Sequence, residues 1–363
     1  PAPGLPRRAK PLIIIAHHAT PPRTPRTMPT ARPHRSLAFP LPLFALALAA
    51  LLATGCATNP STTADDPNVA VAQQLAEARQ AAELGLDDQA LAAFNAVLRD
   101  NPDVTEAHLG VGDIYRKQND FASAESAYQA ATQTDPDNLD AHYYLGLMRQ
   151  LLGRVNDAVT SYLRALLLDP DNFDVRRDLA AAYLQLGEPG QALEHAQRAT
   201  ELDPDSQPAW TNLAAAHALL GDHEAAVDAY RQAAELGELA DQVLLGLADA
   251  HIKLGNFARA QNTLESLIRR NPSATAHERL GYTFFKTRNY SSALRSFRRA
   301  LRLDPNDVAA LNGEGVALMT LYVRGGRIDP RLRDAAIASW RRSINARPSQ
   351  SKIVDLLARY ETL

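Results

Sequence analysis

The chain has few residues that could do covalent or metal chemistry, and they are scattered along it. Its 363 residues contain ten histidines and one cysteine, Cys56. A single thiol forms no internal disulfide, and no second cysteine exists to share a metal ion with it. The sequence contains no phosphate-binding glycine loop, no paired-histidine zinc motif and no nucleophile elbow. We therefore expect no enzymatic activity, no cofactor and no metal site.

One acidic string has part of the pattern of a calcium loop. In "DPDNLD" the carboxylates belong to Asp135, Asp137 and Asp140. The glycine and the distal glutamate that such a loop requires are missing from this string. Because aspartate is common in turns and at helix N-caps, we interpret all three as turn and N-cap residues.

The residues before Cys56 have the layout of a secretory signal. Met28 is followed by a short basic region, an apolar run over residues 37–53 and then small residues. An uncleaved membrane anchor is the alternative. Two prolines interrupt the run, however, and it is short for a membrane span of about 20 residues.

The small residues Ala53, Thr54 and Gly55 directly before Cys56 resemble the lipobox of bacterial lipoproteins. In that family the cysteine becomes the first mature residue and carries acyl chains, and each buried methylene contributes about 0.8 kcal/mol to membrane binding. Ala53 is a departure, since the family prefers leucine there, and an ordinary secreted protein with an unpaired cysteine is the alternative. The resemblance implies lipidation at Cys56 and a periplasm-facing place on the bacterial envelope, with Ala57 favouring the outer membrane.

These features divide the first 70 residues into three segments. Residues 1–27 are rich in proline and arginine, and we expect them to be an extension upstream of a true start at Met28. Residues 28–55 are the expected signal peptide, and residues 56–70 the expected lipidated cysteine with a flexible tether. Without residues 1–56 the chain has 31 basic and 41 acidic residues, a net charge of about −10. That charge argues against nucleic acid as a partner.

Prolines recur at a fixed distance along the rest of the chain. Four of them are 34 residues apart, and three more continue the series after a gap at Glu238: Pro102, Pro136, Pro170, Pro204, Pro272, Pro305 and Pro348. They lie in turn-like strings such as "LDPDN", in which proline cannot continue the preceding helix. Between them apolar residues fall at helical spacing, and alanine and leucine dominate the composition. The pattern predicts a repeated hairpin of two helices.

These hairpins resemble the tetratricopeptide repeat, three of whose positions recur here eight times. A small residue in the first helix recurs as Ala78, Gly112, Gly146, Ala180, Ala214, Ala248, Gly281 and Gly315. An alanine opening the second helix recurs as Ala90, Ala124, Ala158, Ala192, Ala226, Ala260, Ala293 and Ala336. A bulky slot four residues further on holds Phe94, Tyr128, Tyr162, Ala196, Tyr230, Leu264, Phe297 and Trp340. The resemblance implies an all-α, right-handed superhelical solenoid of antiparallel helix hairpins, with about eight repeats over residues 71–348 and a capping helix over 349–363.

Three places depart from the repeat pattern. Ala196 removes the aromatic residue from the fourth repeat, so that a neighbour fills its space or the stack is softer there. Glu238 replaces the proline after the fifth repeat, and about nine extra residues near "YVRGGRIDP" predict a loop in the eighth. Most histidines, such as His108 and His142 in the slot of Trp210, are interpreted as packing residues of the repeats.

In this family the first helices line a concave groove that binds peptides or partner helices. The groove positions that this implies are Tyr143, Leu147, Leu151, Arg177, Leu184, Asn212, Leu219, Leu245 and Ile252. This largely apolar set favours an extended or helical apolar segment of a partner protein. The alternative is that these side chains only pack against neighbouring helices.

Charge is unevenly distributed over the mature chain. Residues 57–268 hold 13 basic and 33 acidic residues, whereas residues 269–363 hold 18 basic and 8 acidic ones. In the seventh repeat one helix carries a basic outer face, made of Arg295, Arg298, Arg299 and Arg302. We expect this face to bind an acidic partner, an anionic envelope polymer or the acidic half of another copy. An ordinary solvated helix face is the alternative.

The sequence as a whole predicts a non-catalytic scaffold of the cell envelope that binds other proteins through its groove. Similar repeat lipoproteins assist assembly of type IV pili or secretion machines, so a pilotin-like assembly factor is the alternative. A targeting subunit for polysaccharide or glycosyl-transfer enzymes is a weaker one.

Overall fold

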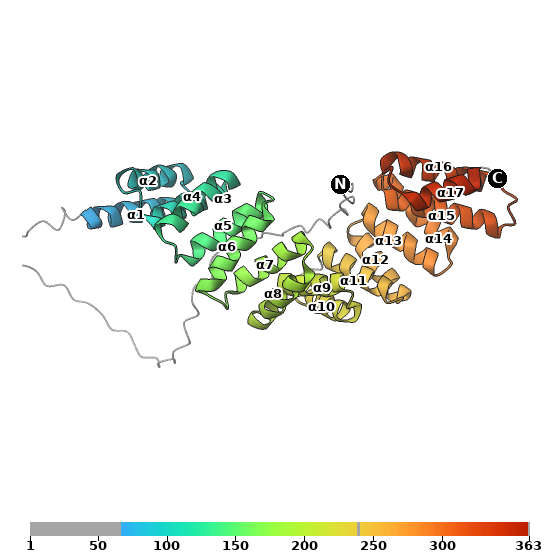
Figure 1. Ribbon diagram of the computed structural model, residues 1–363, viewed down its shortest axis with the longest axis horizontal. Coiled ribbons are helices and arrows are strands. Elements are labelled where there is room, and N and C mark those ends of the chain that lie inside the picture. Colours follow the sequence, from blue (N-terminus) through green and yellow to red (C-terminus); the bar gives the residue numbers. More distant parts are fainter. Residues whose placement is uncertain (1–66, 238–239, 362–363) are drawn as a thin grey trace, which may run out of the picture.

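The computed structural model describes residues 67–237 and 240–361, which form a stack of helix hairpins (Figure 1). All regular structure within these residues is helical, and none of their helices has the length and hydropathy of a membrane span. The helices are α1 (Pro67–Glu83), α2 (Asp87–Asp100), α3 (Thr105–Lys117), α4 (Phe121–Thr134), α5 (Leu139–Leu151), α6 (Val155–Leu168), α7 (Phe173–Leu186), α8 (Pro189–Leu202), α9 (Gln207–Leu220), α10 (His223–Glu235), α11 (Asp241–Lys253), α12 (Phe257–Arg270), α13 (Ala274–Lys286), α14 (Tyr290–Leu303), α15 (Val308–Arg324), α16 (Pro330–Ala346) and α17 (Ser351–Glu361). The expected signal peptide, Cys56 and Glu238 lie outside the described residues.

The odd-numbered helices lie on the inner side of the stack. Each of them from α1 to α15 pairs with the even-numbered helix after it. Most successive odd-numbered helices, such as α5 and α7 or α7 and α9, also contact one another. Successive even-numbered helices up to α16 have no comparable contact in the described part of the chain. The stack therefore curves toward its odd-numbered helices. The solvent-facing side of these helices is called the concave face below. Helices α3 and α5 approach each other less closely than α1 and α3 or α5 and α7 do.

In the repeats that carry an aromatic residue in the bulky slot, a small residue of the first helix packs against that buried ring. A Cβ atom on Gly146 would lie 2.7 Å from the Tyr162 ring, and one on Gly112 would lie 2.7 Å from Tyr128. Both rings are completely buried. The two helices of a hairpin can approach this closely only because the first lacks a side chain at that point. The predicted register of small and bulky positions is confirmed.

The turns between repeats use their aspartate and asparagine side chains as the sequence suggests, with one exception. Asp135 accepts a hydrogen bond from the Asp137 backbone N–H at 3.2 Å, and Asn138 caps α5 by accepting from the Ala141 N–H at 2.9 Å. The interpretation of Asp140 as a turn or N-cap residue is wrong, because Asp140 is the second residue of α5. Its carboxylate therefore does not cap the helix and can interact with other groups.

Histidines in the first helices take part in the packing of the repeats. The rings of His108 and His142 each form a hydrogen bond of 2.8 Å with the carbonyl of a turn proline, Pro102 and Pro136. The indole N–H of Trp210 donates to the carbonyl of Pro204 at the same distance. The described residues contain no group of three or more His, Cys, Asp or Glu side chains placed to hold a metal ion.

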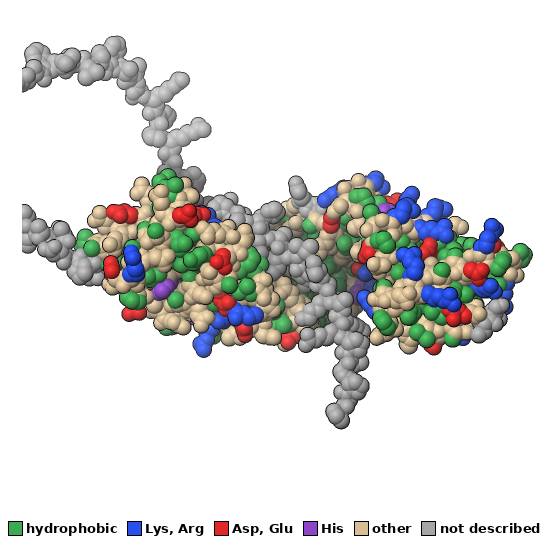
Figure 2. Space-filling view, turned by 90° about the horizontal axis from the view of Figure 1, so that it is seen from above, with side chains coloured by type: hydrophobic (Ala, Val, Ile, Leu, Met, Phe, Trp, Pro, Cys, Tyr) green, Lys and Arg blue, Asp and Glu red, His purple; other side chains and the backbone are tan. Residues whose placement is uncertain are grey.

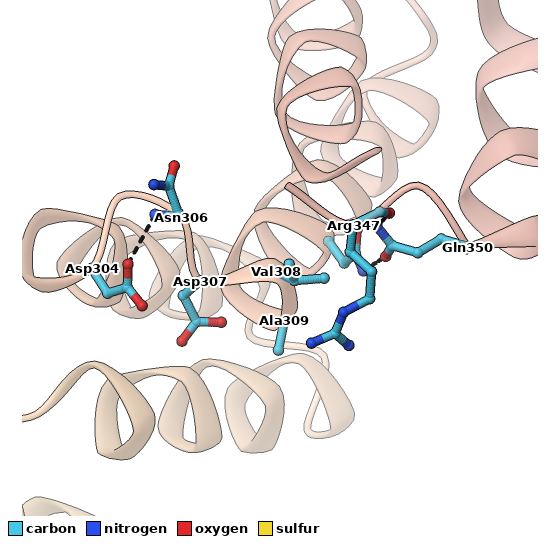
Figure 3. Close-up of a pocket in the computed structure, with 8 residues that line it drawn as sticks. Asp304, Asn306, Asp307, Val308, Ala309, Arg347 and Gln350 are labelled. Atoms are coloured by element: carbon cyan, nitrogen blue, oxygen red, sulfur yellow. Dashed lines mark hydrogen bonds between the residues drawn. The ribbon is translucent and has the colours of Figure 1, made fainter. Parts of the chain in front are cut away.

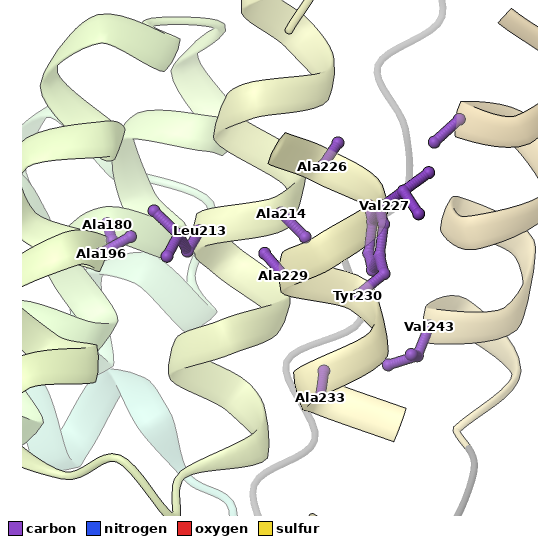
Figure 4. Packing of buried hydrophobic residues seen from close by; sticks show 11 residues of the cluster. Ala180, Ala196, Leu213, Ala214, Ala226, Val227, Ala229, Tyr230, Ala233 and Val243 are labelled. Carbon is purple, nitrogen blue, oxygen red and sulfur yellow. The ribbon is translucent and has the colours of Figure 1, made fainter. Parts of the chain in front are cut away.

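The missing aromatic residue at Ala196 is matched by a larger side chain on the next helix. Elsewhere the position sixteen residues after the ring is often glycine, as at Gly246, whose Cβ would lie 2.2 Å from Tyr230. After Ala196 this position holds Asn212, which is itself buried. Ala196 belongs to a continuous cluster with Leu213 and Tyr230 (Figure 4). Ala196 is completely buried within this cluster, so neighbouring side chains fill the space, which is the first of the two expected outcomes.

The extra residues of the eighth repeat mostly lengthen its helices. Both α15 and α16 have 17 residues, whereas most other helices have 13 or 14. Only residues 325–329 remain between them, so the expected loop lies between these two helices but is shorter than the extra residues suggest. Helix α17 follows, with Ile353 buried and the Tyr360 ring 6.3 Å from that of Trp340, and it covers the side of the last hairpin.

The glycine–ring contact gives a direct test of the packing. We expect Gly146→Ala to lower the free energy of unfolding by about 1–3 kcal/mol, because the new methyl group collides with the fixed Tyr162 ring. Gly190→Ala in α8 is the matched control, since nothing lies within 4 Å of its Cβ position. There the gain in helix propensity should leave stability unchanged or raised by up to about 1 kcal/mol. Urea denaturation followed by circular dichroism measures both, and equal effects would contradict the packing argument.

Candidate protein-binding surface

The expected groove residues do not form one continuous apolar surface. Leu147 and Leu184 are 8% and 3% exposed and belong to the core between helices. For these two the packing alternative holds, because contacts between successive hairpins use the apolar side chains at this register. A partner cannot reach them in this arrangement.

The other expected groove residues differ widely in their accessibility. Leu151, Leu245 and Ile252 are half-buried against core clusters. Asn212 is buried, and its amide donates to the carbonyl of Arg177 at 3.0 Å. Leu219, at the end of α9, is 52% exposed. Among the expected residues Leu219 alone is exposed, whereas Tyr143 and Arg177 are half-buried but carry polar groups that are useful for recognition.

On α3 an arginine is fixed by two neighbours. The Arg116 guanidinium donates to Asp113 at 2.9 Å and to the Tyr128 hydroxyl at 3.1 Å, and that hydroxyl donates to Asp113 at 2.8 Å. The guanidinium carbon lies 4.9 Å from the centre of the Tyr144 ring, which stacks on Tyr128 with 5.4 Å between centroids. Tyr144 on α5 therefore fills the wider space between α3 and α5 and holds Arg116 over its face.

On α7 a second arginine sits among carboxylates. Arg177 donates to both oxygens of Asp178 at 2.8 and 3.0 Å and to Asp174 at 2.6 Å. The Tyr143 hydroxyl, on α5, donates to Asp178 at 2.9 Å. Burial lowers the pKa of Arg177, but the charge of Asp178, the hydrogen bond to it and the nearby Tyr143 and Asp174 together outweigh this effect, so the net pKa lies above the ordinary value. Arg177 therefore stays charged and fixes the geometry of α5 against α7.

Asp140, on the helix between α3 and α7 in the order of first helices, has no partner in the described chain. It stands one helical turn before Tyr144 on α5, so both side chains lie on the same face. Desolvation, and next the charge of Asp113, raise the pKa of Asp140 above its ordinary range. The carboxylate thus sits in a negative local field while it is still open to solvent.

We call this region the tyrosine–aspartate surface. Its members come from α3, α5 and α7 and are Asp113, Arg116, Asp140, Tyr143, Tyr144, Asp174, Arg177 and Asp178. It contains four carboxylates and two guanidinium groups. The pKa of Tyr144 is raised by desolvation and by the charges of three of these carboxylates, against the opposing effect of Arg116. Such a surface can bind, through charge and aromatic contact, but it holds no paired nucleophile and base.

Sequence reasoning found Tyr143 and Arg177 but missed the other members of this surface. A signal was present, because Asp140 and Asp174 are 34 residues apart, as are Tyr143 and Arg177. Residues at the same register of successive repeats lie next to one another on the concave face. Polar columns at this register would have located the surface.

A second charged group occupies the concave face further along. Arg279 on α13 donates to Asp249 on α11 at 2.8 Å and also pairs with its neighbour Glu278. Burial raises the pKa of both carboxyl groups, and Arg279 opposes that rise in each case. The charges of this group pair with one another, so it has less unpaired charge than the tyrosine–aspartate surface.

A hollow of about 450 Å³ lies where the turn before α15 meets the link from α16 to α17 (Figure 3). Most of its polar groups are already used. Asp307 caps α15, Asp304 accepts from the Asn306 N–H at 3.0 Å, and Gln350 accepts from Asn312 at 2.7 Å. The hollow is therefore part of the structure of the last repeat and does not present a converging set of binding groups.

The basic outer face of α14 is only partly free. Arg298 pairs with Glu314 at 3.0 Å, and Arg295 donates to Ser292 at 2.7 Å. Arg299 and Arg302 are exposed and form no ion pair within the described chain. Figure 2 shows that Lys and Arg side chains gather over the C-terminal repeats. The role of this face in binding stays a prediction.

Comparison with known families identifies the repeat. Models of the tetratricopeptide repeat match residues 75–138, 112–174, 245–308 and 279–329, and further models of the same repeat match residues 150–216 and 207–236. These matches cover more than half of the chain. The chain belongs to the tetratricopeptide repeat family.

Solved structures show the same fold at low sequence identity. A tetratricopeptide repeat protein from Parabacteroides merdae ATCC 43184 is similar at 19% identity and a TM-score of 0.54, covering 70% of this chain and 97% of that one. The APC/C hetero-tetramer Cut9–Hcn1 is similar at 17% identity and a TM-score of 0.53, over 79% of this chain and 55% of that one. PilW, described as a type IV pilus biogenesis factor, is similar at 21% identity and a TM-score of 0.48, over 56% and 94%. A comparison with curated protein sequences finds no match.

The arginine of α7 should be important for stability. We expect Arg177→Met to lower the free energy of unfolding by about 3 kcal/mol, because it leaves the buried Asp178 carboxylate without its counter-charge. The double variant Arg177→Met with Asp178→Leu should recover part of this loss, since it removes the unpaired charge. Arg198→Met, which breaks an exposed ion pair with Asp171, is the control and should shift the urea midpoint little. A double variant less stable than Arg177→Met alone would contradict this assignment.

Proposed function

We propose that the protein is a non-catalytic scaffold that binds segments of partner proteins across the concave face of α3, α5 and α7. The observation that carries the proposal is the tyrosine–aspartate surface. It brings together two half-buried tyrosines, two fixed guanidinium groups and the exposed carboxylates of Asp140 and Asp174 on three successive first helices. The tetratricopeptide fold, which is suited to protein interaction, supports the same conclusion.

The surface is well organised for recognition before any partner arrives. Arg116 and Arg177 are held by carboxylates and tyrosine hydroxyls, so that binding need not order these long side chains. Groups fixed in advance lose less entropy on binding. Tyr143 and Tyr144 supply large, rigid contact areas, as tyrosine commonly does in protein interfaces.

We further propose that this scaffold acts at the bacterial cell envelope, anchored through Cys56. The signal-like segment and the lipobox resemblance support this placement. Replacing Cys56 with serine should move the full-length protein from the membrane to the soluble fraction and abolish incorporation of labelled palmitate. Persistence of Cys56→Ser in the membrane fraction with no loss of label would overturn the anchor.

A narrower role stays a prediction from the sequence. Assembly of a type IV pilus or secretion machine is one such role, and targeting of polysaccharide or glycosyl-transfer enzymes is another. The identity of the bound partner decides between them.

Site-specific photo-crosslinking tests the concave surface in cells. We expect a benzophenone amino acid at Tyr144 to form adducts with one defined segment of a partner protein, mapped by mass spectrometry. The control position is Leu167 on α6, which is 72% exposed and lies on an even-numbered helix. Adducts from Leu167 to the same segment, or none from Tyr144, would count against the concave face as the binding surface.

A further inference from the structure

The tyrosine–aspartate surface has an unbalanced charge. Its four carboxylates face two guanidinium groups, and both arginines are already engaged by the carboxylates beside them. The first-turn acids of three successive first helices show where the imbalance lies. Glu106 pairs with Arg79 at 2.8 Å and Asp174 pairs with Arg177 at 2.6 Å, whereas Asp140 between them has no partner in the described chain. Of these three aligned acids, only the middle one, Asp140, lacks a cationic partner.

The groups around Asp140 suit a cationic side chain. The hydroxyl of Tyr144 has no hydrogen-bond partner within the described residues, and the charges of Asp113, Asp140 and Asp174 all act on it. Guanidinium groups already lie over two rings nearby, Arg116 at 4.9 Å from the centre of Tyr144 and Arg177 at 5.4 Å from that of Phe173. Carboxylates beside open aromatic side chains attract ammonium and guanidinium groups.

We propose that the tyrosine–aspartate surface selects partner segments that carry lysine or arginine, and that one such side chain binds beside Asp140, between Asp113 and Asp174. The proposal rests on the proposed function and names the class of segment that this surface takes. The occupant is an extended basic segment of another protein, because the surface lies along three parallel first helices and its free charge is negative.

Other occupants fit the charge pattern less well. An acidic segment would place like charges against Asp113, Asp140 and Asp174. An apolar segment would remove these carboxylates from water without a compensating partner, which is costly. A second copy of this chain could offer the exposed arginines of α14, and the experiment treats that case separately.

The test measures binding of synthetic peptides to the full-length protein by isothermal titration calorimetry. Three peptides share one framework with a central tyrosine and differ only in carrying lysine, glutamine or glutamate at the same positions. We expect the lysine peptide to bind most tightly and to weaken with added salt, and the glutamate peptide to bind least. Asp140→Asn should weaken the lysine peptide about three- to fivefold, the effect of losing one partly exposed ion pair.

The matched control is Asp137→Asn. It removes the same charge three residues away, from an exposed residue of the turn before α5. Its lysine-peptide affinity should match that of the wild type. An equal loss in both variants would mean that only the general negative charge of this half of the molecule matters, and the proposed site would be wrong.

The remaining outcomes separate the selectivity from the function it rests on. If glutamine or glutamate peptides bind as tightly as the lysine peptide, the proposed selectivity fails, while binding of segments at the concave face stands. If no peptide binds, and crosslinks from Tyr144 are also missing, both proposals fail. Self-association in sedimentation that is lost in both Asp140→Asn and the double variant Arg299→Glu, Arg302→Glu would identify a second copy as the occupant and overturn the proposed partner.

Discussion

The contact of a small residue with a buried ring sets the geometry on which the rest of this solenoid depends. With Gly146 against Tyr162, the two helices of a hairpin are held at a separation that no larger residue at position 146 would permit. Because the contact recurs at the same register, successive first helices are placed at regular intervals. Regular placement turns residues 34 positions apart in sequence into neighbours on one face.

Much of this architecture could be predicted from the sequence, because the same small and bulky positions recur in each repeat. Rings such as Tyr128 and Tyr162, and the small residues facing them, are defined by contacts within a hairpin, and periodicity exposes them. The lengthened helices of the eighth repeat were harder to foresee. Whether extra residues extend a helix or form a loop depends on packing against α17 and not on the repeat pattern alone.

The binding surface was less predictable because it depends on contacts between repeats. Leu147 and Leu184 occupy groove positions of the family pattern, yet close packing of neighbouring hairpins buries them. Tyr144 separates α3 from α5 and becomes accessible where its counterparts in other repeats, such as Gly110 and Gly246, have no side chain at all. The residue at this position is matched to the side chains of the neighbouring repeat. The pattern of a single repeat does not show which residues face one another across two repeats.

Local helix chemistry explains why the concave face is charged. An acid in the first turn interacts favourably with the helix N-terminus, and α3, α5 and α7 each carry one: Glu106, Asp140 and Asp174. The repeat register then aligns these acids in a column, although no single helix requires their neighbours to be acidic. Repulsion along the column is relieved by an arginine wherever the chain supplies one. Apolar side chains at this register, such as Leu147 and Leu184, are buried between hairpins. The groups that remain accessible to a partner on α3, α5 and α7 are therefore mainly polar, and this favours recognition by charge.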